Sequence, residues 1–200
     1  MDAAPLVGKD APFYDPELAS NGGPYSDKIE IGQVTVRLPI QWSALPLAAL
    51  FFGFVPWVIP LVILMYIAFS PTPFLGIFAL VLCGICVLVS EVILKHLIYD
   101  PRPETTAVRN ADGTVTNGMP SGHVLQTCTL AMWFLLESFS RFTLTPALIS
   151  AALCVALMLA VPWARVYNGD HTIMQVAAGA GLGLLFGLVA FAIDENVIPL

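Results

Sequence analysis

Five long apolar runs, separated by short polar segments, constrain the fold of this chain more than any other feature of its sequence. They extend over residues 45–69, 74–99, 121–139, 146–167 and 172–193. Each has about the length that a helix needs to cross a hydrocarbon core of roughly 30 Å. The sequence therefore predicts an all-α integral membrane protein with about five transmembrane helices.

The composition favours the same class and excludes others. Hydrophobic residues make up 58% of the 200 residues and charged residues only 11%, whereas soluble domains carry about 25% charged residues. The net charge is −6 and no cluster rich in Lys or Arg is present, so nucleic acid is not an expected partner. The four cysteines all lie within apolar runs, where we expect buried small side chains rather than disulfides or metal ligands.

The first 40 residues differ from the rest because they are polar and contain many prolines and glycines. We therefore expect an irregular N-terminal tail over 1–40 and a membrane domain over 41–200. Within the tail, the segment from Ile29 to Leu38 alternates apolar and polar residues. That alternation is typical of a short strand or of an extended segment at the membrane interface.

Prolines and glycines in the first and last runs predict how those helices pack. Pro46, Pro56 and Pro60 should kink the first helix, which membrane helices tolerate where neighbours satisfy the freed carbonyls. The last run carries glycines at four-residue spacing, which allow another helix to approach closely, either within this chain or in a homo-oligomer. These glycines are Gly179, Gly183 and Gly187.

The polar residues at the ends of the runs are expected to meet on one side of the membrane. Because five spans alternate in direction, the end of the second, the start of the third, the end of the fourth and the start of the fifth share a side. The N-terminal tail should lie there too, with Leu200 on the opposite side. Charged residues in membrane segments are costly, so they are candidates for a functional site. The residues at these four places are Lys95 and Arg102, Ser121 and His123, Arg165, and His171.

This set of residues has the chemistry of a phosphate site. Three cations and the N–H groups at a helix start, beside Ser121 and Gly122, suit a phosphate and the charge that develops on it. Of the two histidines, one can attack phosphorus and the other can protonate the departing oxygen.

Two further roles follow from the same residues. Glu91 lies four residues before Lys95, so the two can pair on one helix face and hold the lysine in place. A metal site built from His123, His171 and Asp170 is conceivable, but the three nearby cations would repel a divalent ion.

Three spaced motifs contain these residues, in order: Lys95-x6-Arg102-Pro103, Pro120-Ser121-Gly122-His123 and Ala164-Arg165-x5-His171-x3-Gln175. They resemble the type 2 phosphatidic acid phosphatase superfamily, whose pattern is K-x6-R-P, P-S-G-H and S-R-x5-H-x3-D. The resemblance implies a helical bundle in which His171 forms a phosphohistidine and His123 is the general acid. It also implies that Lys95, Arg102 and Arg165, with Ser121 and Gly122, hold the phosphate oxygens. No metal or other cofactor is expected in this family.

Two positions depart from the family pattern. Ala164 stands where Ser is usual, and Gln175 stands where Asp usually orients the nucleophilic histidine. Glutamine can accept a hydrogen bond from an imidazole N–H, but it cannot stabilise an imidazolium by charge. Either turnover is weaker, or another carboxylate assists, with the adjacent Asp170 as the first candidate.

Gln175, the Gly-Met-Pro-Ser-x-His stretch and the short five-span layout are similar to the dolichyl-diphosphatase branch. The resemblance implies a polyprenyl diphosphate substrate, cleaved to the monophosphate and phosphate at the lumenal face of the endoplasmic reticulum. This reaction would recycle the lipid carrier of glycan assembly. Membrane lipids and a lipid phosphate are the expected partners, and a homo-oligomer or a membrane complex stays open.

Two other functions also stay open. The chain could be a related phosphatase that acts on phosphatidate, sphingoid phosphates or a bacterial polyprenyl carrier. It could instead be a non-catalytic subunit of a membrane complex or a lipid-binding protein, which Gln175 and Ala164 leave possible. The retained cations and histidines argue against a pure scaffold, because such a protein gains little from burying them.

Overall fold

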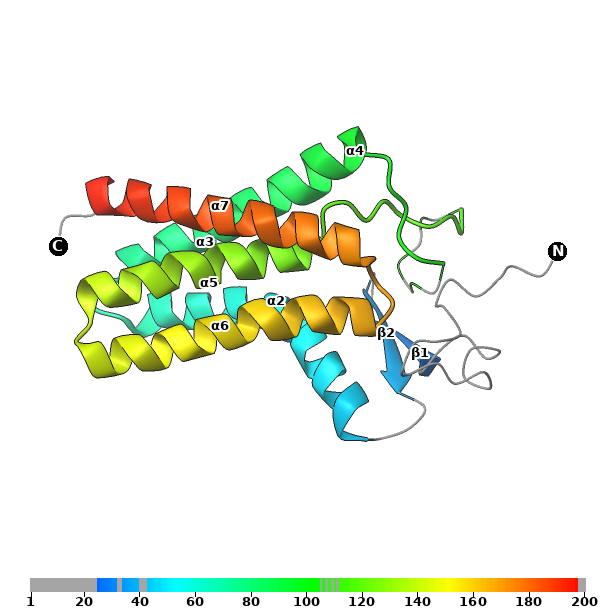
Figure 1. The fold of residues 1–200 in the computed structure, drawn as a ribbon, viewed down its shortest axis with the longest axis horizontal. Coiled ribbons are helices and arrows are strands. Elements are labelled where there is room, and N and C mark those ends of the chain that lie inside the picture. The colour runs from blue at the N-terminus through cyan, green and yellow to red at the C-terminus, as the bar shows by residue number, and fades with distance from the viewer. Residues whose placement is uncertain are drawn as a thin grey trace.

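In a computed structural model of the protein, the described residues are 25–31, 34–39, 43–104, 106, 108, 110 and 112–197. The five expected membrane segments form long helices that lie side by side, with α5 in the middle (Figure 1). The second segment is continuous but passes through a π-helical stretch, η1. The elements are α2 (Ala44–Phe69), α3 (Phe74–Val87), η1 (Leu88–Leu94), α4 (Lys95–Leu97), α5 (Gly122–Arg141), α6 (Leu144–Tyr167) and α7 (Ile173–Val197).

Four of these segments are long and apolar enough to cross a membrane, and α5 is the exception. α5 carries polar residues such as Gln126, Thr127 and Thr129, all of which are buried. The other helices lie around α5 (Figure 1), and most of its side chains are buried within the protein. The predicted all-helical membrane bundle of about five segments is therefore confirmed, with polar residues in its central helix.

The N-terminal tail contains a two-stranded antiparallel sheet. β1 (Tyr25–Ile31) pairs with β2 (Val34–Pro39), and Ile29 lies opposite Val36. The extended segment expected from Ile29 to Leu38 thus contains parts of both strands. The sheet lies at the end of the bundle where α6 connects to α7 (Figure 1), on the side expected for the tail. The rest of the predicted tail, and Leu200, lie outside the described residues.

Helix α2 contains Pro56 and Pro60 and bends, so that its N-terminal part is angled away from the other helices (Figure 1). Pro60 has no N–H to donate to the carbonyl of Pro56, four residues earlier. The side chain of Gln126 on α5 takes over this role, because its Nε2 donates to Pro56 O at 3.1 Å. The expected proline kink is present, and a neighbouring helix satisfies the carbonyl that it frees.

The glycines of α7 pack against α5. A Cβ atom at Gly179, Gly183 or Gly187 would lie only 2.6 to 2.7 Å from a backbone oxygen of Ser121, Leu125 or Thr129. Backbone atoms cannot move aside as a side chain can, so residues with side chains would push the helices apart. Of the two packing alternatives, close packing within the chain is therefore the one present. It fixes the position of α7 along the axis of α5.

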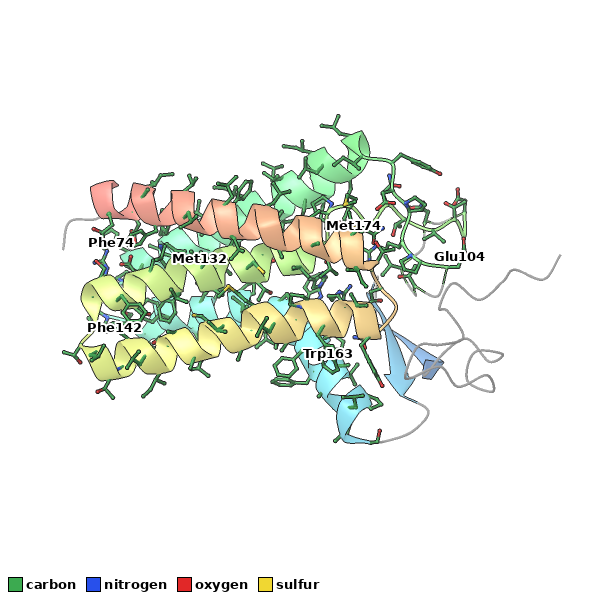
Figure 2. The ribbon with its side chains drawn as sticks, viewed as in Figure 1. Phe74, Glu104, Met132, Phe142, Trp163 and Met174 are labelled. Carbon is green, nitrogen blue, oxygen red and sulfur yellow. The ribbon has the colours of Figure 1, made fainter. Side chains whose placement is uncertain are left out.

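The two ends of the bundle are distinct. Figure 2 shows Met174 and Glu104 at one end, and Phe74 and Phe142 at the other. The end with Met174 holds the α6–α7 connection and the loop that joins α4 to α5, and we call it the loop end. The opposite end holds Glu137, Arg141 and Asp194, and we call it the far end.

Candidate functional site

The loop end brings together the starts of α5 and α7 and the end of α6. The backbone N–H of Ser121, the residue before α5, donates to the carbonyl of Gln175 on α7 at 3.0 Å. The backbone carbonyl of Arg165 on α6 accepts from the N–H groups of Asp170 and His171, at 3.1 and 3.3 Å. These backbone bonds hold the α6–α7 connection compactly, so that Arg165, His171 and Ser121 share one region.

Lys95 comes directly after the π-helical segment η1 and is buried. Its Nζ lies 2.5 Å from Glu91 Oε1, so the expected Glu91–Lys95 pair is present. π-helical segments are uncommon and occur frequently at functional sites. Here the segment also faces the start of α5, since a Cβ atom at Gly122 would lie 2.5 Å from Glu91 Oε1.

Hydrogen bonds to residues 116 and 117 hold the segment that contains Arg102. Its backbone N–H donates to Thr116 O at 3.0 Å, and Asn117 Nδ2 donates to Lys95 O at 2.9 Å. Pro101 and Asn117 also form an isolated antiparallel bridge. The loop therefore folds back on itself, which fixes the buried Arg102 side chain relative to Lys95.

Several hydrogen-bond donors at this end are buried and have no partner among the described residues: Arg102 Nε and Nη1, Arg165 Nε and Ser121 Oγ. Arg165 Nη1 is paired, at 3.0 Å from Asp170 Oδ2. Buried polar groups are nearly always hydrogen-bonded, so each exception needs an explanation. Four unpaired donor atoms beside three cationic side chains are suited to the oxygens of an anion such as phosphate.

His171 is buried and contacts Gln175, with Nδ1 at 3.1 Å from Oε1. The amide orientation follows from its other contacts, because Nε2 of Gln175 donates to Pro101 O at 2.9 Å and to Asp100 Oδ2 at 3.0 Å. Oε1 can only accept, so Nδ1 of His171 must carry the proton. The other ring nitrogen, Nε2, then has a free lone pair, and it has no partner in the described part of the chain.

Electrostatics keep His171 neutral. Burial first, and then the charges of Arg102, Arg165 and Lys95, lower the pKa of His171 well below its usual value, whereas the hydrogen bond to Gln175 raises it. Burial and the neighbouring Arg165 also lower the pKa of Arg102 to about 10. At neutral pH the site therefore combines an uncharged imidazole with charged guanidinium groups. That combination favours nucleophilic attack by nitrogen on a bound anion.

His123 lies on the first turn of α5. Its ring packs edge-to-face on Trp57 of α2, with ring centroids 5.6 Å apart. Arg165, Arg102 and Lys95 all lie within electrostatic range of it. The site thus holds both histidines near the same three cations, as the topology predicted.

One contact of this site was not predicted from the sequence. Asp100 accepts a hydrogen bond from Gln175 Nε2, whereas Asp170, the carboxylate expected to help the histidine, pairs with Arg165. Asp100 lies between Lys95 and Arg102 in the first motif, and this position is the only sequence feature that points to a role for it.

Within the described residues, no group of three His, Cys, Asp or Glu side chains could hold a metal ion.

The fold and the site together define a helical membrane protein with a buried cationic cluster and two histidines at one end of the bundle. Residues 72–199 match the family model of the PAP2 superfamily, so the chain belongs to this superfamily. The resemblance read from the three motifs is thus confirmed at the level of the superfamily.

Two known proteins are similar to this chain. "Lipid phosphate phosphatase delta" of Arabidopsis thaliana is 25% identical over an alignment of 114 residues that covers 52% of this chain and 27% of that protein. The chain thus aligns with about a quarter of the length of that relative. The crystal structure of the "first transmembrane PAP2 type phosphatidylglycerolphosphate phosphatase from Bacillus subtilis" matches with a TM-score of 0.64 and 21% identity. The match covers 80% of this chain and 81% of the Bacillus subtilis chain, so the two proteins share a fold.

Proposed function

We propose that this chain is a membrane lipid phosphatase that hydrolyses dolichyl or another polyprenyl diphosphate to the monophosphate and phosphate. One observation carries the proposal. The unpaired Nε2 of the buried His171 occurs in a cluster with unpaired donors of Arg102, Arg165 and Ser121. A terminal phosphate held by those donors would present its phosphorus to this nitrogen.

In the first step, His171 Nε2 attacks the terminal phosphorus and a phosphohistidine forms. The bond from phosphorus to the bridging oxygen breaks, and the lipid monophosphate leaves with the bonding electrons. His123 would donate a proton to that oxygen. The negative charge of the bound diphosphate would offset the three cations and so allow the ring of His123 to carry that proton. The charge on the transferred phosphoryl oxygens is stabilised by Lys95, Arg102 and Arg165, by Ser121 and by the N–H groups at the start of α5.

In the second step, water attacks the phosphohistidine. His123, now neutral, takes a proton from the water, phosphate leaves, and His171 returns to its starting form. Glu91 would keep Lys95 in place through both steps, and Gln175 would keep the proton on His171 Nδ1. All of these roles use side chains of the chain itself, so the proposed reaction needs no metal or other cofactor.

A diphosphate substrate suits a site of this composition. The leaving group is then a phosphate monoester, which is far less basic than the alkoxide released from a simple phosphate ester. The departure of such a leaving group needs less help from a general acid. It also needs less of the negative charge that an Asp at position 175 would supply and that Gln175 cannot. The resemblance of Gln175 and of the Pro120 motif to the dolichyl-diphosphatase branch points the same way.

In this proposal residues 41–200 form the phosphatase domain and residues 1–40 form a separate polar tail. The enzyme would lie in the endoplasmic reticulum membrane with its loop end in the lumen, where it would recycle the lipid carrier for protein glycosylation. The isoprenoid chain would contact membrane lipids or lie between helices.

The test is release of phosphate from a polyprenyl diphosphate by the purified protein, with a chelator present. We expect release that survives chelation and disappears in His171→Ala, together with trapped phosphohistidine in the wild type only. Asp112→Asn is a matched control, because Asp112 lies in the exposed tip of the α4–α5 loop. Labelled phosphate that remains on the His171→Ala protein would overturn the assignment of the nucleophile.

A second candidate is a phosphatase for other lipid phosphates, such as phosphatidate or sphingoid phosphates. The name of the Arabidopsis relative favours it. A panel of these substrates at equal surface concentration separates the two candidates. A kcat/KM for phosphatidate above that for the diphosphate would favour this second function.

A third candidate is a catalytically weak or inactive subunit of a membrane complex, which Ala164 and Gln175 favour because they replace two residues of the family pattern. Stoichiometric co-purification with other membrane proteins, together with no turnover of any lipid phosphate, would support it. In that case Gln175→Asp is the first reversion to test.

A further inference from the structure

We propose that Asp100 is a positioning residue that acts on His171 through the side-chain amide of Gln175. This inference rests on the proposed function, because it concerns the same nucleophile. In this chain, the negative charge that the family pattern places at residue 175 would instead come from the first motif, one hydrogen bond further from the histidine.

The contacts form an unbroken chain of three side chains. His171 Nδ1 lies 3.1 Å from Gln175 Oε1, and Gln175 Nε2 lies 3.0 Å from Asp100 Oδ2. The backbone N–H of Thr172 also donates to Oε1 at 3.2 Å, and Pro101 O accepts from Nε2 at 2.9 Å. Donors and acceptors therefore agree on a single orientation of the amide.

The burial of Gln175 makes this arrangement effective. Gln175 is fully buried, and hydrogen bonds in a low-dielectric interior polarise one another. The carboxylate of Asp100 draws the amide dipole towards itself, which leaves Oε1 more negative and a better acceptor for the Nδ1 proton. When phosphorylation makes the ring of His171 cationic, the same polarisation stabilises that cation.

No other described carboxylate is placed to do this. Asp170 is adjacent to His171 but lies 3.0 Å from Arg165 Nη1, and Glu91 lies 2.5 Å from Lys95 Nζ. Both are therefore engaged with cations of the phosphate site. Asp100 has no cation within salt-bridge distance among the described residues, and its Oδ2 meets the amide of Gln175.

The first test is Asp100→Asn, which removes the charge and can keep the hydrogen bond from Gln175. A unit charge about 8 Å from the ring, at an effective dielectric constant of about 20, corresponds to roughly 30-fold in rate. We therefore expect kcat for a polyprenyl diphosphate to fall about 10- to 30-fold, with KM unchanged or lower. A raised KM with unchanged kcat would mean that the variant disturbs the Arg102 loop, and would overturn the proposal.

The pH profile gives a readout that a structural role would not move. Loss of a negative charge makes protonation of His171 harder, so the acid limb of kcat/KM should move to lower pH in Asp100→Asn. An acid limb that stays in place, or moves to higher pH, would count against the relay. Both proteins keep the charged groups near His171, which are Lys95 from α4, Arg102 from the loop and Arg165 from α6. They also keep Asp170, which pairs with Arg165, and His123 of α5, which lies near the same three cations.

The decisive experiment is a double-mutant cycle with Gln175→Asp, which restores the residue usual in the superfamily. With Asp at position 175 the ring has its own carboxylate, and Asp100 becomes a like charge beside it. Asp100→Asn should then cost less than about 2-fold, or raise kcat, whereas it costs 10-fold or more in the wild-type background. Equal losses in both backgrounds would show that Asp100 only supports the loop.

The wild-type protein separates this proposal from the proposed function. If the wild type releases no phosphate from any lipid phosphate, the proposed function fails, and the relay with it. If the wild type turns over but Asp100→Asn equals the control Asp112→Asn, only the relay fails.

Discussion

The loop end and the far end of the bundle both bury charged side chains, but they bury opposite signs. At the loop end, the side chain of Lys95 is 8% exposed and its partner Glu91 is 46% exposed. At the far end, the side chains of Glu137 and Asp194 are 1% and 0% exposed, and their partner Arg141 is 19% exposed. The cations are therefore buried at one end and the carboxylates at the other.

The unpaired atoms differ in the same way. At the loop end they are mainly donors, on Arg102, Arg165 and Ser121. At the far end they are mainly carboxylate oxygens, one on Glu137 and one on Asp194, together with Nη2 of Arg141. The other oxygens of Glu137 and Asp194 lie within ion-pair distance of Arg141. Trp133 Nε1 also donates to Asp194 at 3.3 Å.

These contacts have different consequences at the two ends. The far-end contacts join α5 to α7, because Glu137, Arg141 and Trp133 lie on α5 and Asp194 lies on α7. The loop-end cations have fewer counter-ions inside the protein, as expected where a bound anion supplies the missing charge. Buried charge thus links α5 to α7 at the far end and lines the proposed phosphate site at the loop end.

The largest expected effect that separates the ends is on activity. Arg102→Met keeps an unbranched, flexible side chain but removes the guanidinium that faces the proposed phosphate. We expect kcat/KM to fall about 10²- to 10³-fold, while the melting temperature stays the same or rises because like charges no longer crowd together. Phosphate release and thermal unfolding in detergent measure the two quantities. A clear loss of stability would remove the contrast between the ends.

Arg141→Met is the matched change at the far end. It leaves Glu137 and Asp194 buried without a cation, which should destabilise the fold by about 3 kcal/mol. Turnover per folded molecule should not change, because the site lies at the other end of the bundle. Loss of activity at a temperature where the variant is fully folded would contradict this prediction.

The pH dependence gives a smaller effect at the loop end alone. Because burial and the nearby cations lower the pKa of His171, the neutral nucleophile should persist as the pH falls below about 6.5. The acid limb of kcat/KM should therefore lie below that pH in the wild type. Arg102→Met removes one of these cations, so it should move the acid limb to higher pH. Arg102→Lys keeps the positive charge, so its acid limb should stay in place.

Glu91→Gln should have the smallest effect. Glu91 is 46% exposed, so water screens its ion pair with Lys95, and ion pairs screened in this way contribute about 0 to 1 kcal/mol. We expect unchanged stability and a rise in KM of no more than about fivefold, because Lys95 loses the partner that holds it. An unchanged KM would show that the pair has no part in substrate binding.

The sequence predicted much of the fold because membrane helices follow one strong rule. Each apolar run must be long enough to span the bilayer and must pair its backbone N–H and C=O groups by hydrogen bonds within the protein. The five runs therefore match the five helical segments closely. Proline and glycine positions also predicted packing, as the Gln126–Pro56 bond and the contacts of Gly179 show.

Other features depend on contacts that no local pattern contains. The π-helical segment around Glu91 lies within an apolar run that looks the same as that of an ordinary α-helix. The sequence pattern therefore does not distinguish the two kinds of helix, and only the three-dimensional structure reveals it. The pairing of β1 with β2 required a partner that alternation alone does not identify.

At the site, topology predicted that the three cations and two histidines would meet. It could not predict which carboxylate would contact Gln175. Asp170 is nearer in sequence, but the α4–α5 loop places Asp100 beside the amide.

The polar interior of α5 has a consequence for how the protein enters the membrane. A segment with Gln126, Glu137 and Arg141 would partition weakly from a translocation channel into lipid by itself. The glycine face of α7, which fits against the α5 backbone, is made only later along the chain. Stable integration of α5 is therefore expected to wait until α6 and α7 have emerged, so that the three helices enter the bilayer together.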